Sequence, residues 1–340
     1  MTHLEPTRLP DRLRDTQRLL FIAKHARWTG GLHPDDGNHA LYHRETREIL
    51  EGLDIPLAVE NDYAALFTRP DADFVFPLLN RGGFYNSEML LPLLCNRLGL
   101  PYVGASPIVR GLSDDKHLTK LEAAARGVPT APWALFRRGA PTDVTRCPPA
   151  RRWVIKPNNS SASWGIRDAH DRIELAQAIA EIHALDHDAI VEPFLDGSDV
   201  EVPVITIGGE PAMLPMMIFE QADPTHLRTY QEKRDLVDRS AKYSLKLFDA
   251  GMLAEQIVDY TRRMAEVFRP FDYGRFEFRI DFVTGEVRLL EVNLNCNLWS
   301  GKVFGRAAIA AGFTQADLIE TIVAESMIRQ IGVASERDAA

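Results

Sequence analysis

The stretch from residue 275 to residue 293 constrains the fold of this chain more than any other part of the sequence. In its first half, apolar and charged residues alternate with the two-residue period of a β-strand that has one apolar face. Thr284-Gly285 has turn composition, because glycine adopts positive φ without steric cost. The stretch therefore predicts a hairpin of two adjacent strands. Its apolar positions are Phe276, Phe278, Ile280 and Phe282.

Oxygen-bearing side chains on this hairpin suggest a cation site. If the loop holds an odd number of residues, Asp281 lies on the same face as Glu291 and Asn293. Three hard oxygen ligands would then converge, as they do where Mg²⁺ is held by carboxylates and substrate phosphates. Arg279 would lie beside them and could clamp a carboxylate or stabilise an oxyanion. The alternative is a solvated hairpin face with ordinary surface charges.

Composition and charge exclude several classes of protein. The 340 residues are 45% hydrophobic and 26% charged, with a net charge of −9, so a broad basic face for nucleic acid is not expected. Three scattered cysteines argue against a disulfide framework and a zinc cage, and they fit a reducing compartment. Neither a signal peptide nor an apolar run of about 18 residues is present, so we expect a cytoplasmic protein without a membrane span.

The first 112 residues predict a small α/β unit with an open parallel sheet. Residues 1 to about 17 suggest a loose arm, and strands are expected at 18–24, 73–79 and 101–104 with helices at 39–53 and 87–98. Ligands of such sheets bind beyond the carboxyl ends of the strands, which here lead into the 25–38 and 80–87 loops.

Two further units are expected, at 113–190 and 191–335. The first should contain a helix that ends at Gly127 and a strand at 153–157. The second should contain a strand from 201 to 207, which Pro203 would restrict to a sheet edge or a bulge. Its polar segment 221–242 resembles a mobile lid, and helices are expected at 254–268 and 314–331.

Several lysines and one acid could bind a nucleotide. Lys156 ends an apolar strand beside the small-residue loop 160–165, where backbone amides can approach a phosphate closely. The alternative is an ordinary serine-rich turn. Lys116 and Lys120 share one helix face, either as an exposed basic edge or with one of them pointing into a nucleotide cleft. Glu192 follows a strand and could read an adenine edge, although the same residues also make a good turn.

The order of these features resembles the ATP-grasp superfamily, and within it the D-alanine–D-alanine ligase branch. The resemblance runs from about residue 73 to 320. It implies an α/β and α+β protein, in which an N-terminal open parallel α/β domain precedes a two-subdomain ATP-grasp fold. The motifs that carry it are Leu100–Gly104, Leu112–Lys116, Gly127–Trp133, Val154–Pro157, Val191–Glu192, Arg279–Phe282 and Leu290–Asn293.

The resemblance also implies a role for individual residues. Two Mg²⁺ ions, or Mn²⁺, would be held by Asp281, Glu291 and Asn293, and Arg279 would steady an acyl phosphate and a tetrahedral intermediate. Ser163 keeps one of two paired serines in the family's phosphate loop and is expected to take part in catalysis. The expected ATP contacts are Lys116 and Lys156 on the phosphates or base, Glu192 and the Leu195 backbone on adenine, Asp199 on the ribose, and Lys233 from the lid.

The chain departs from the family where amino acids bind. The family's His-Gly-x-x-Gly-Glu-Asp-Gly loop becomes Leu79–Asn86 without the acids, and the Pro-Gly after Glu-x-Asn becomes Cys296-Asn297. We therefore expect an ATP-dependent ligase that joins an amino acid to another amino acid or a small carboxylate, in specialised metabolism. A genuine D-alanine–D-alanine ligase, another ATP-grasp ligase or kinase, and a non-catalytic nucleotide-binding protein are the alternatives. Expected substrate contacts are Asp35, Asp36, Asn80, Arg81, Asn295, Asn297 and Lys302, and a homodimer through the first domain is expected.

Overall fold

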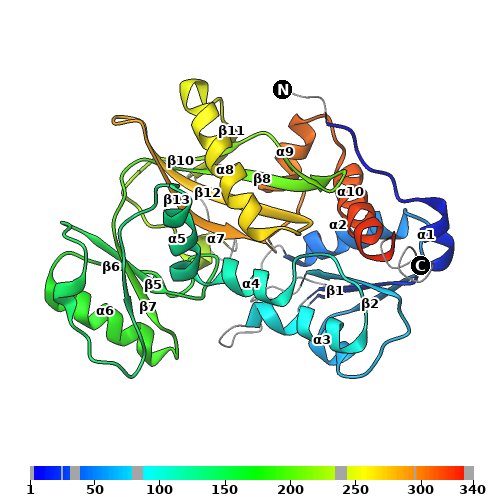
Figure 1. Ribbon diagram of the computed structural model, residues 1–340, viewed down its shortest axis with the longest axis horizontal. Helices are drawn as coiled ribbons and strands as arrows, with labels where there is room; N and C mark the ends of the chain where they lie inside the picture. The colour runs from blue at the N-terminus through cyan, green and yellow to red at the C-terminus, as the bar shows by residue number, and fades with distance from the viewer. Residues whose placement is uncertain are drawn as a thin grey trace.

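Three sheets from successive parts of the chain form the framework of the protein (Figure 1). The computed structural model describes residues 4–23, 26–30, 39–78, 87–233, 243–294 and 296–332. Its parallel sheet followed by two antiparallel sheets confirms the predicted fold class. Short 3₁₀ turns occur at Tyr63–Leu66, Ser87–Met89, Val144–Arg146 and Gly251–Leu253, and a π-helical turn at Ile328–Gly332.

The first sheet is parallel and has the strand order β2-β1-β3. All five residues of β1 are buried, as expected for the central strand of a covered parallel sheet. The predicted strand at 101–104 contributes only a single bridge from Tyr102 to Val75, and β2 was not predicted. The elements are β1 (Leu19–Ala23), β2 (Leu57–Glu60), β3 (Phe74–Leu78), α2 (His39–Glu51) and α3 (Leu90–Leu98).

The N-terminal segment is tied to the C-terminal helices, so the expectation of a loose arm is wrong. Leu9 and Leu13 are buried, and the segment forms the short helix α1 (Asp11–Thr16). Arg8 and Arg14 pair with Glu320 at 2.7 and 2.9 Å. Glu320 lies on α10 (Gln315–Met327), which begins at a capping box and packs with α9 (Val303–Ala310) into the core of the first sheet.

The second sheet is antiparallel, with the order β4-β7-β5-β6 and a separate apolar core under α6. Asp115 caps α5 by accepting a hydrogen bond from the Leu118 backbone N–H. The predicted boundary at 190 falls inside β7. The elements are α4 (Pro107–Asp114), α5 (Lys116–Ala125), β4 (Ala134–Phe136), β5 (Trp153–Pro157), β6 (Arg167–Ala169), α6 (Arg172–Ala184) and β7 (Ala189–Pro193).

The third sheet has the order β11-β10-β8-β12-β13, with β9 also pairing with β8. Pro203 therefore lies in a central strand, not at an edge. The N and C=O of Pro203 face the side of β8 where β9 ends and β10 has not yet begun, and the carbonyl accepts from the Leu214 N–H there. Because no strand pairs with Pro203 on that side, the missing proline N–H breaks no hydrogen bond of the sheet. The elements are β8 (Ser198–Ile207), β9 (Glu210–Met213), β10 (Met217–Gln221), α7 (Tyr230–Lys233), β11 (Tyr243–Leu247), α8 (Ala254–Phe268), β12 (Tyr273–Asp281) and β13 (Glu286–Asn293).

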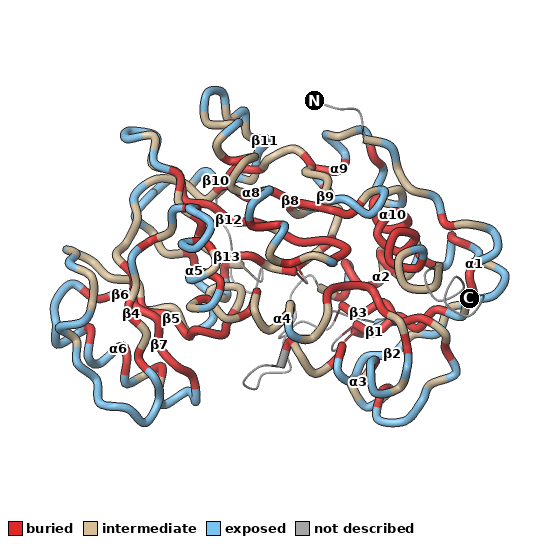
Figure 2. Tube along the Cα trace, in the orientation of Figure 1, coloured by how far each residue is buried: buried red, intermediate tan, exposed pale blue. Residues whose placement is uncertain are grey.

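The two faces of β12 have different surroundings. Phe276, Phe278 and Ile280 are fully buried in a core shared with α8. Helix α8 lies across this sheet in Figure 1, and β12 is drawn largely in the red of buried residues in Figure 2. Arg275 and Glu277 project from the opposite face. The alternation predicted for the hairpin thus places one face in an apolar core and leaves the other for polar chemistry.

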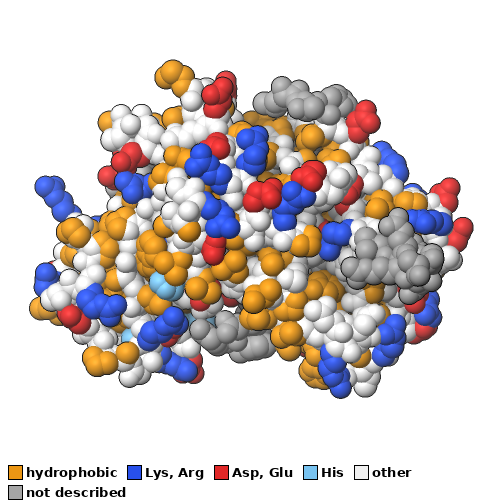
Figure 3. All heavy atoms as spheres, viewed as in Figure 1, with side chains coloured by type: hydrophobic (Ala, Val, Ile, Leu, Met, Phe, Trp, Pro, Cys, Tyr) orange, Lys and Arg blue, Asp and Glu red, His pale blue; other side chains and the backbone are white. Residues whose placement is uncertain are grey.

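On the face drawn in Figure 3, basic and acidic side chains are interspersed among the described residues. In the described part of the chain no single helix is long and apolar enough to cross a membrane. Among the described helices, only the pair Val303–Ala310 and Gln315–Gly332 passes that test together, with a bend of 102° between its halves.

Candidate active site

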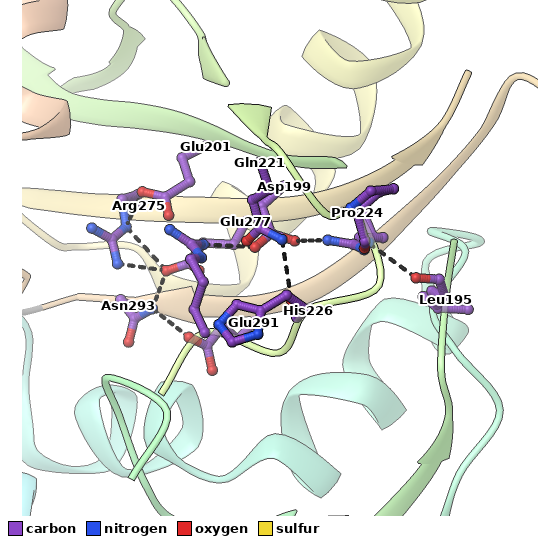
Figure 4. A network of polar contacts seen from close by, with 12 residues as sticks. Leu195, Asp199, Glu201, Gln221, Pro224, His226, Arg275, Glu277, Glu291 and Asn293 are labelled. Atoms are coloured by element: carbon purple, nitrogen blue, oxygen red, sulfur yellow. Dashed lines mark hydrogen bonds and ion pairs between the residues drawn. The ribbon is translucent and has the colours of Figure 1, made fainter. Parts of the chain in front are cut away.

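A one-residue bulge in the hairpin decides which acids meet. Glu277 on β12 lies opposite Glu291 on β13, whereas Phe278 lies opposite Leu289, so Leu290 is an extra residue on β13. The Asn293 amide bridges the two acids, donating to Glu277 Oε1 at 2.5 Å and to Glu291 Oε1 at 3.1 Å (Figure 4). Two carboxylates and an amide therefore converge on one face of the sheet.

Asp281 does not join this cluster, so the predicted convergence of Asp281 with Glu291 and Asn293 is wrong. Asp281 pairs with Glu286 across a loop of four residues, 282–285, an even number where the prediction required an odd one. It stands four residues from Glu277, about 13 Å along the strand. Its carboxylate accepts from the Val283 N–H and from the Thr284 hydroxyl, both at 2.8 Å, so Asp281 stabilises the turn.

Arg279 also lies away from the acid cluster, contrary to its predicted place beside the cation ligands. Its guanidinium donates to Asp199 Oδ1 at 2.8 Å, to the Leu195 carbonyl at 3.0 Å and to the Pro224 carbonyl at 3.1 Å. These contacts hold β8 and the segment after β10 against β12. Figure 4 shows Leu195 and Pro224 on one side of the network, Arg275 on the other and Asp199 between them.

Arg275 occupies the place that the sequence analysis gave to Arg279. It donates twice to Glu277 Oε1, from Nε at 3.0 Å and from Nη2 at 2.7 Å. Its Nε also lies 2.8 Å from Glu201 Oε2 on β8. Burial raises the pKa of Glu201 to about 7, and the neighbouring Glu277 adds to this rise while Arg275 opposes it.

The donor set of Glu277, Glu291 and Asn293 fits a hard divalent cation. Carboxylate oxygens, together with the oxygen of an amide that can turn over, are ligands that Mg²⁺ and Mn²⁺ accept. Burial alone would raise the pKa of Glu291, but the charges of Lys116 and Lys233 outweigh it and lower the pKa to about 2. Within the described ranges, no three His, Cys, Asp or Glu side chains form a metal-binding group.

Three lysines surround one pocket with these acids. Lys116, Lys156 and Lys233 all line it, and Lys116 Nζ lies 3.4 Å from Glu291 Oε2. Lys233 comes from α7, so the lid segment does reach the site. Of the two lysines on α5, Lys116 is the one that points into the pocket, which resolves the alternative that their spacing left open.

The small-residue loop forms one wall of the same pocket. Residues 160–163 line it, and both Ala162 and Ser163 adopt positive φ, at 53° and 60°. Such conformations cost on the order of 1 kcal/mol or more for each non-glycine residue and are concentrated at binding sites. Ser163 therefore lines the pocket in a turn with positive φ, and its part in catalysis stays a prediction.

Glu192 lies between two lysines. Its carboxylate contacts Lys120 Nζ at 2.8 Å and Lys156 Nζ at 2.7 Å, and all three side chains are buried. Burial would raise the pKa of Glu192, but the two ammonium groups outweigh it and lower the pKa to about 2. Glu192 and Leu195 both line the pocket, while the carboxylate of Glu192 is engaged with lysines and the Leu195 carbonyl with Arg279.

Asp199 is clamped by two arginines. Arg228 Nη2 lies 2.6 Å from Asp199 Oδ2, and Arg279 Nη1 lies 2.8 Å from Oδ1. Burial opposes ionisation of Asp199, yet the two guanidinium groups hold its pKa well below the usual range. Arg228 also stacks over the Phe219 ring, with its guanidinium carbon 4.0 Å from the ring centroid. Asp199 is thus both a pocket residue and the anchor of the segment that carries Lys233.

Two of the seven expected amino-acid contacts, Asn297 and Lys302, lie among the described residues. Asn297 lies in a local turn, where its Oδ1 accepts from the Trp299 N–H at 2.7 Å, and Lys302 precedes α9. Neither lines the pocket of the lysines. The other five lie outside the described residues: Asp35, Asp36, Asn80, Arg81 and Asn295.

Sequence analysis missed Arg275, Glu277, Glu201 and Arg228. Arg275-Phe-Glu277 and Arg279-Ile-Asp281 are two copies of one arginine–acid pattern, four residues apart. Either copy could face Glu291 until the bulge is known. Glu201 carried a usable signal, since it is an acid inside an apolar strand. Arg228 carried none.

Comparison with known proteins places this site in a family. The family model described as D-ala D-ala ligase C-terminus matches residues 123–324, more than half of the chain. An uncharacterised protein of Sinorhizobium fredii is 30% identical, over 71% of each chain. A D-alanine–D-alanine ligase of Carboxydothermus hydrogenoformans is 24% identical, over 79% of this chain and 86% of that one.

Solved structures show the same fold. The ATP complex of D-alanine–D-alanine ligase from Bacillus anthracis superposes with a TM-score of 0.72 at 17% identity, covering 91% of this chain and 96% of that one. The predicted resemblance is confirmed. The chain belongs to the D-alanine–D-alanine ligase family, a branch of the ATP-dependent, ADP-forming ATP-grasp ligases.

Proposed function

We propose that this protein joins the carboxylate of one small molecule to the amine of an amino acid, with release of ADP and phosphate. One observation carries the proposal. Lys116, Lys156 and Lys233 gather around a single pocket that also contains the Glu277–Glu291 pair. Three cations opposite two acids suit a polyphosphate held together with divalent cations. Family membership supports the nucleotide as ATP.

The residues of the pocket divide the work of such a reaction. The three lysines would neutralise phosphate charge and orient the γ-phosphoryl group toward the attacking carboxylate, giving an acyl phosphate. The turn at 160–163 would bind phosphate oxygens through backbone N–H groups. When bound by Glu277, Glu291 and Asn293, one or two Mg²⁺ or Mn²⁺ ions would supply further charge neutralisation.

Arg275 is the residue that we assign to the second step. When an amine displaces phosphate from the acyl group, negative charge develops on the carbonyl oxygen, and a fixed guanidinium beside the acids can stabilise it. Arg279 would instead keep the lid segment in place through Asp199 and Pro224. A closed segment over the pocket would exclude water, which otherwise hydrolyses an acyl phosphate.

The substrate pair is proposed to differ from two molecules of D-alanine. The support is in the sequence, because Leu79–Asn86 and Cys296-Asn297 replace two motifs of the family while the lysines and Glu-x-Asn remain. This pattern supports a reaction that joins an amino acid to another amino acid or to a small carboxylate, in specialised metabolism. The alternative is the reaction for which relatives such as the Carboxydothermus hydrogenoformans enzyme are named, D-alanine ligation.

The test is an ADP-release screen over L- and D-amino acids, offered singly and in pairs with small carboxylates, followed by product mass. We expect ADP release that depends on one particular pair, with a product equal to the two substrates minus water. Release with D-alanine alone would establish the alternative. Phosphorylated product without an amide would contradict ligation. The division at 112 and 190, cytoplasmic location and a homodimer remain predictions.

A further inference from the structure

Arg275 lies between two buried acids on neighbouring strands. Glu201 on β8 and Glu291 on β13 both lie opposite Glu277 on β12, so three carboxylates stand in register across the sheet. Glu201 and Glu277 are 3% and 5% exposed. A single guanidinium from Arg275 contacts both of them, at 2.8 Å from Glu201 and at 2.7 Å from Glu277 (Figure 4).

The hydrogen bonds of this trio are unevenly shared. Glu277 Oε1 accepts three of them: two from Arg275 and one from Asn293. Glu201 Oε2 is nearer to Arg275 Nε than Glu277 Oε1 is, yet it receives no directed hydrogen bond from any residue that the structure describes. A buried carboxylate oxygen that is ion-paired but accepts no directed hydrogen bond is unusual, so its retention calls for an explanation.

A cation at Glu277 would change this balance. Glu277 Oε1 is the oxygen that the Asn293 amide links to Glu291, so a divalent cation held by these three side chains would compete with Arg275 for its lone pairs, and a guanidinium repels a cation at such short range. Arg275 must therefore give up hydrogen bonds to Glu277 when the cation binds. A buried guanidinium without a second carboxylate would resist that change, because its charge would lose its partner.

We propose that Glu201 is a positioning residue, the second acceptor to which Arg275 turns when a divalent cation takes Glu277. This inference rests on the proposed function, in which Glu277 binds the cation. Arg275 Nε needs only to turn its N–H toward Glu201 Oε2, which already lies 2.8 Å away. Glu201 thereby frees Glu277 for the cation and keeps Arg275 beside the reacting groups.

The experiment measures Mn²⁺ affinity by electron paramagnetic resonance, with ATP present, in the wild-type protein and in Glu201→Gln, Arg275→Gln and the double variant. Glu201→Gln should weaken Mn²⁺ binding about tenfold, the usual size of an effect on a metal site transmitted through a neighbouring residue. In the Arg275→Gln background the same substitution should change affinity less than about twofold, because the effect passes through the arginine. Glu220→Gln is the control, since Glu220 is an exposed acid of the same sheet, paired with Lys246.

Each outcome decides a different question. The role of Glu201 would be overturned if Glu201→Gln bound Mn²⁺ with wild-type affinity. It would also be overturned if the loss of Mn²⁺ affinity in the double variant equalled the product of the losses in the two single variants. If the wild-type protein binds no Mn²⁺ with ATP, the proposed cation site itself fails, and the inference fails with it. Should Glu201→Gln not fold, Glu201→Asp keeps the charge but draws the carboxylate back from Arg275. It should also weaken Mn²⁺ binding, and unchanged affinity would count against the proposal.

Discussion

Glu277 and Asp281 are acids on one strand, and their surroundings differ enough for activity to separate them. Glu277→Gln removes a carboxylate from the centre of the acid cluster, whereas Asp281→Asn alters a turn acceptor at the hairpin tip. We expect Glu277→Gln to lower kcat about 100-fold or more, the size of effect seen when one charge-stabilising group is removed. Asp281→Asn should retain activity within about threefold. Steady-state ADP release checks both, and the reverse order would restore Asp281 as the ligand.

At the same scale, Glu192 should contribute to the free energy of unfolding. Glu192→Gln leaves two buried lysines without their shared counter-charge, so the free energy of unfolding at pH 7 should fall by about 3–5 kcal/mol. Because the folded-state pKa of Glu192 is lowered from 4.5 to about 2, its contribution is present above 4.5 and is lost as the pH falls toward 2.

Urea denaturation at several pH values tests this sign. The difference between wild type and Glu192→Gln should shrink between pH 4.5 and pH 2. Glu181→Gln, which removes an exposed partner of Arg167, is the control and should change stability little. A difference that grows on acidification would show that the lysines do not hold the charge of Glu192.

Strand contacts at the element scale depend on one glycine between β7 and β8. Gly197 has φ of +104°, and a Cβ at this position would lie 1.9 Å from the Ile280 carbonyl oxygen of β12. Gly197→Ala should therefore push the segment before β8 away from β12 or prevent folding. The loss in free energy of unfolding should exceed the roughly 1–2 kcal/mol of an alanine in the left-handed conformation. Gly139→Ala is the matched control, since its φ of +79° carries the same strain in open space. Thermal unfolding compares them, and equal losses would contradict the close contact.

Elements were predicted well where periodicity or capping residues mark them. α8 begins and ends where its apolar spacing indicates, and α5 ends before the glycine at 127 as expected. The bulge at Leu290 was not predictable, because the sequence of β13 is compatible with either register and only its packing against β12, α4 and α5 selects one. That single residue moved the site from Asp281 to Glu277, while Glu291, Asn293 and the lysines stayed where the motifs put them.

At the scale of the whole molecule, the N-terminal segment around Leu9 and the helices α9 and α10 share one core. Thr7, Arg8 and Leu9 bind acids of α10, and Leu9 is buried against it. Deleting residues 1–10 should lower the free energy of unfolding by at least about 2 kcal/mol, the value of one buried leucine. It should also leave Glu320 short of partners. Urea denaturation measures the loss, and an unchanged midpoint would mean that the N-terminal segment does not contribute.

The same arrangement sets an order for biosynthesis. The apolar side chains of β1 and β3 share their core with Phe304, Ile319, Ile322 and Met327. The first sheet is synthesised before these partners. It must therefore stay partly uncovered until α9 and α10 have emerged from the ribosome, whereas the apolar core under α6 is built from described residues between 134 and 191. Chaperones that shield young chains would act mainly on the uncovered first sheet.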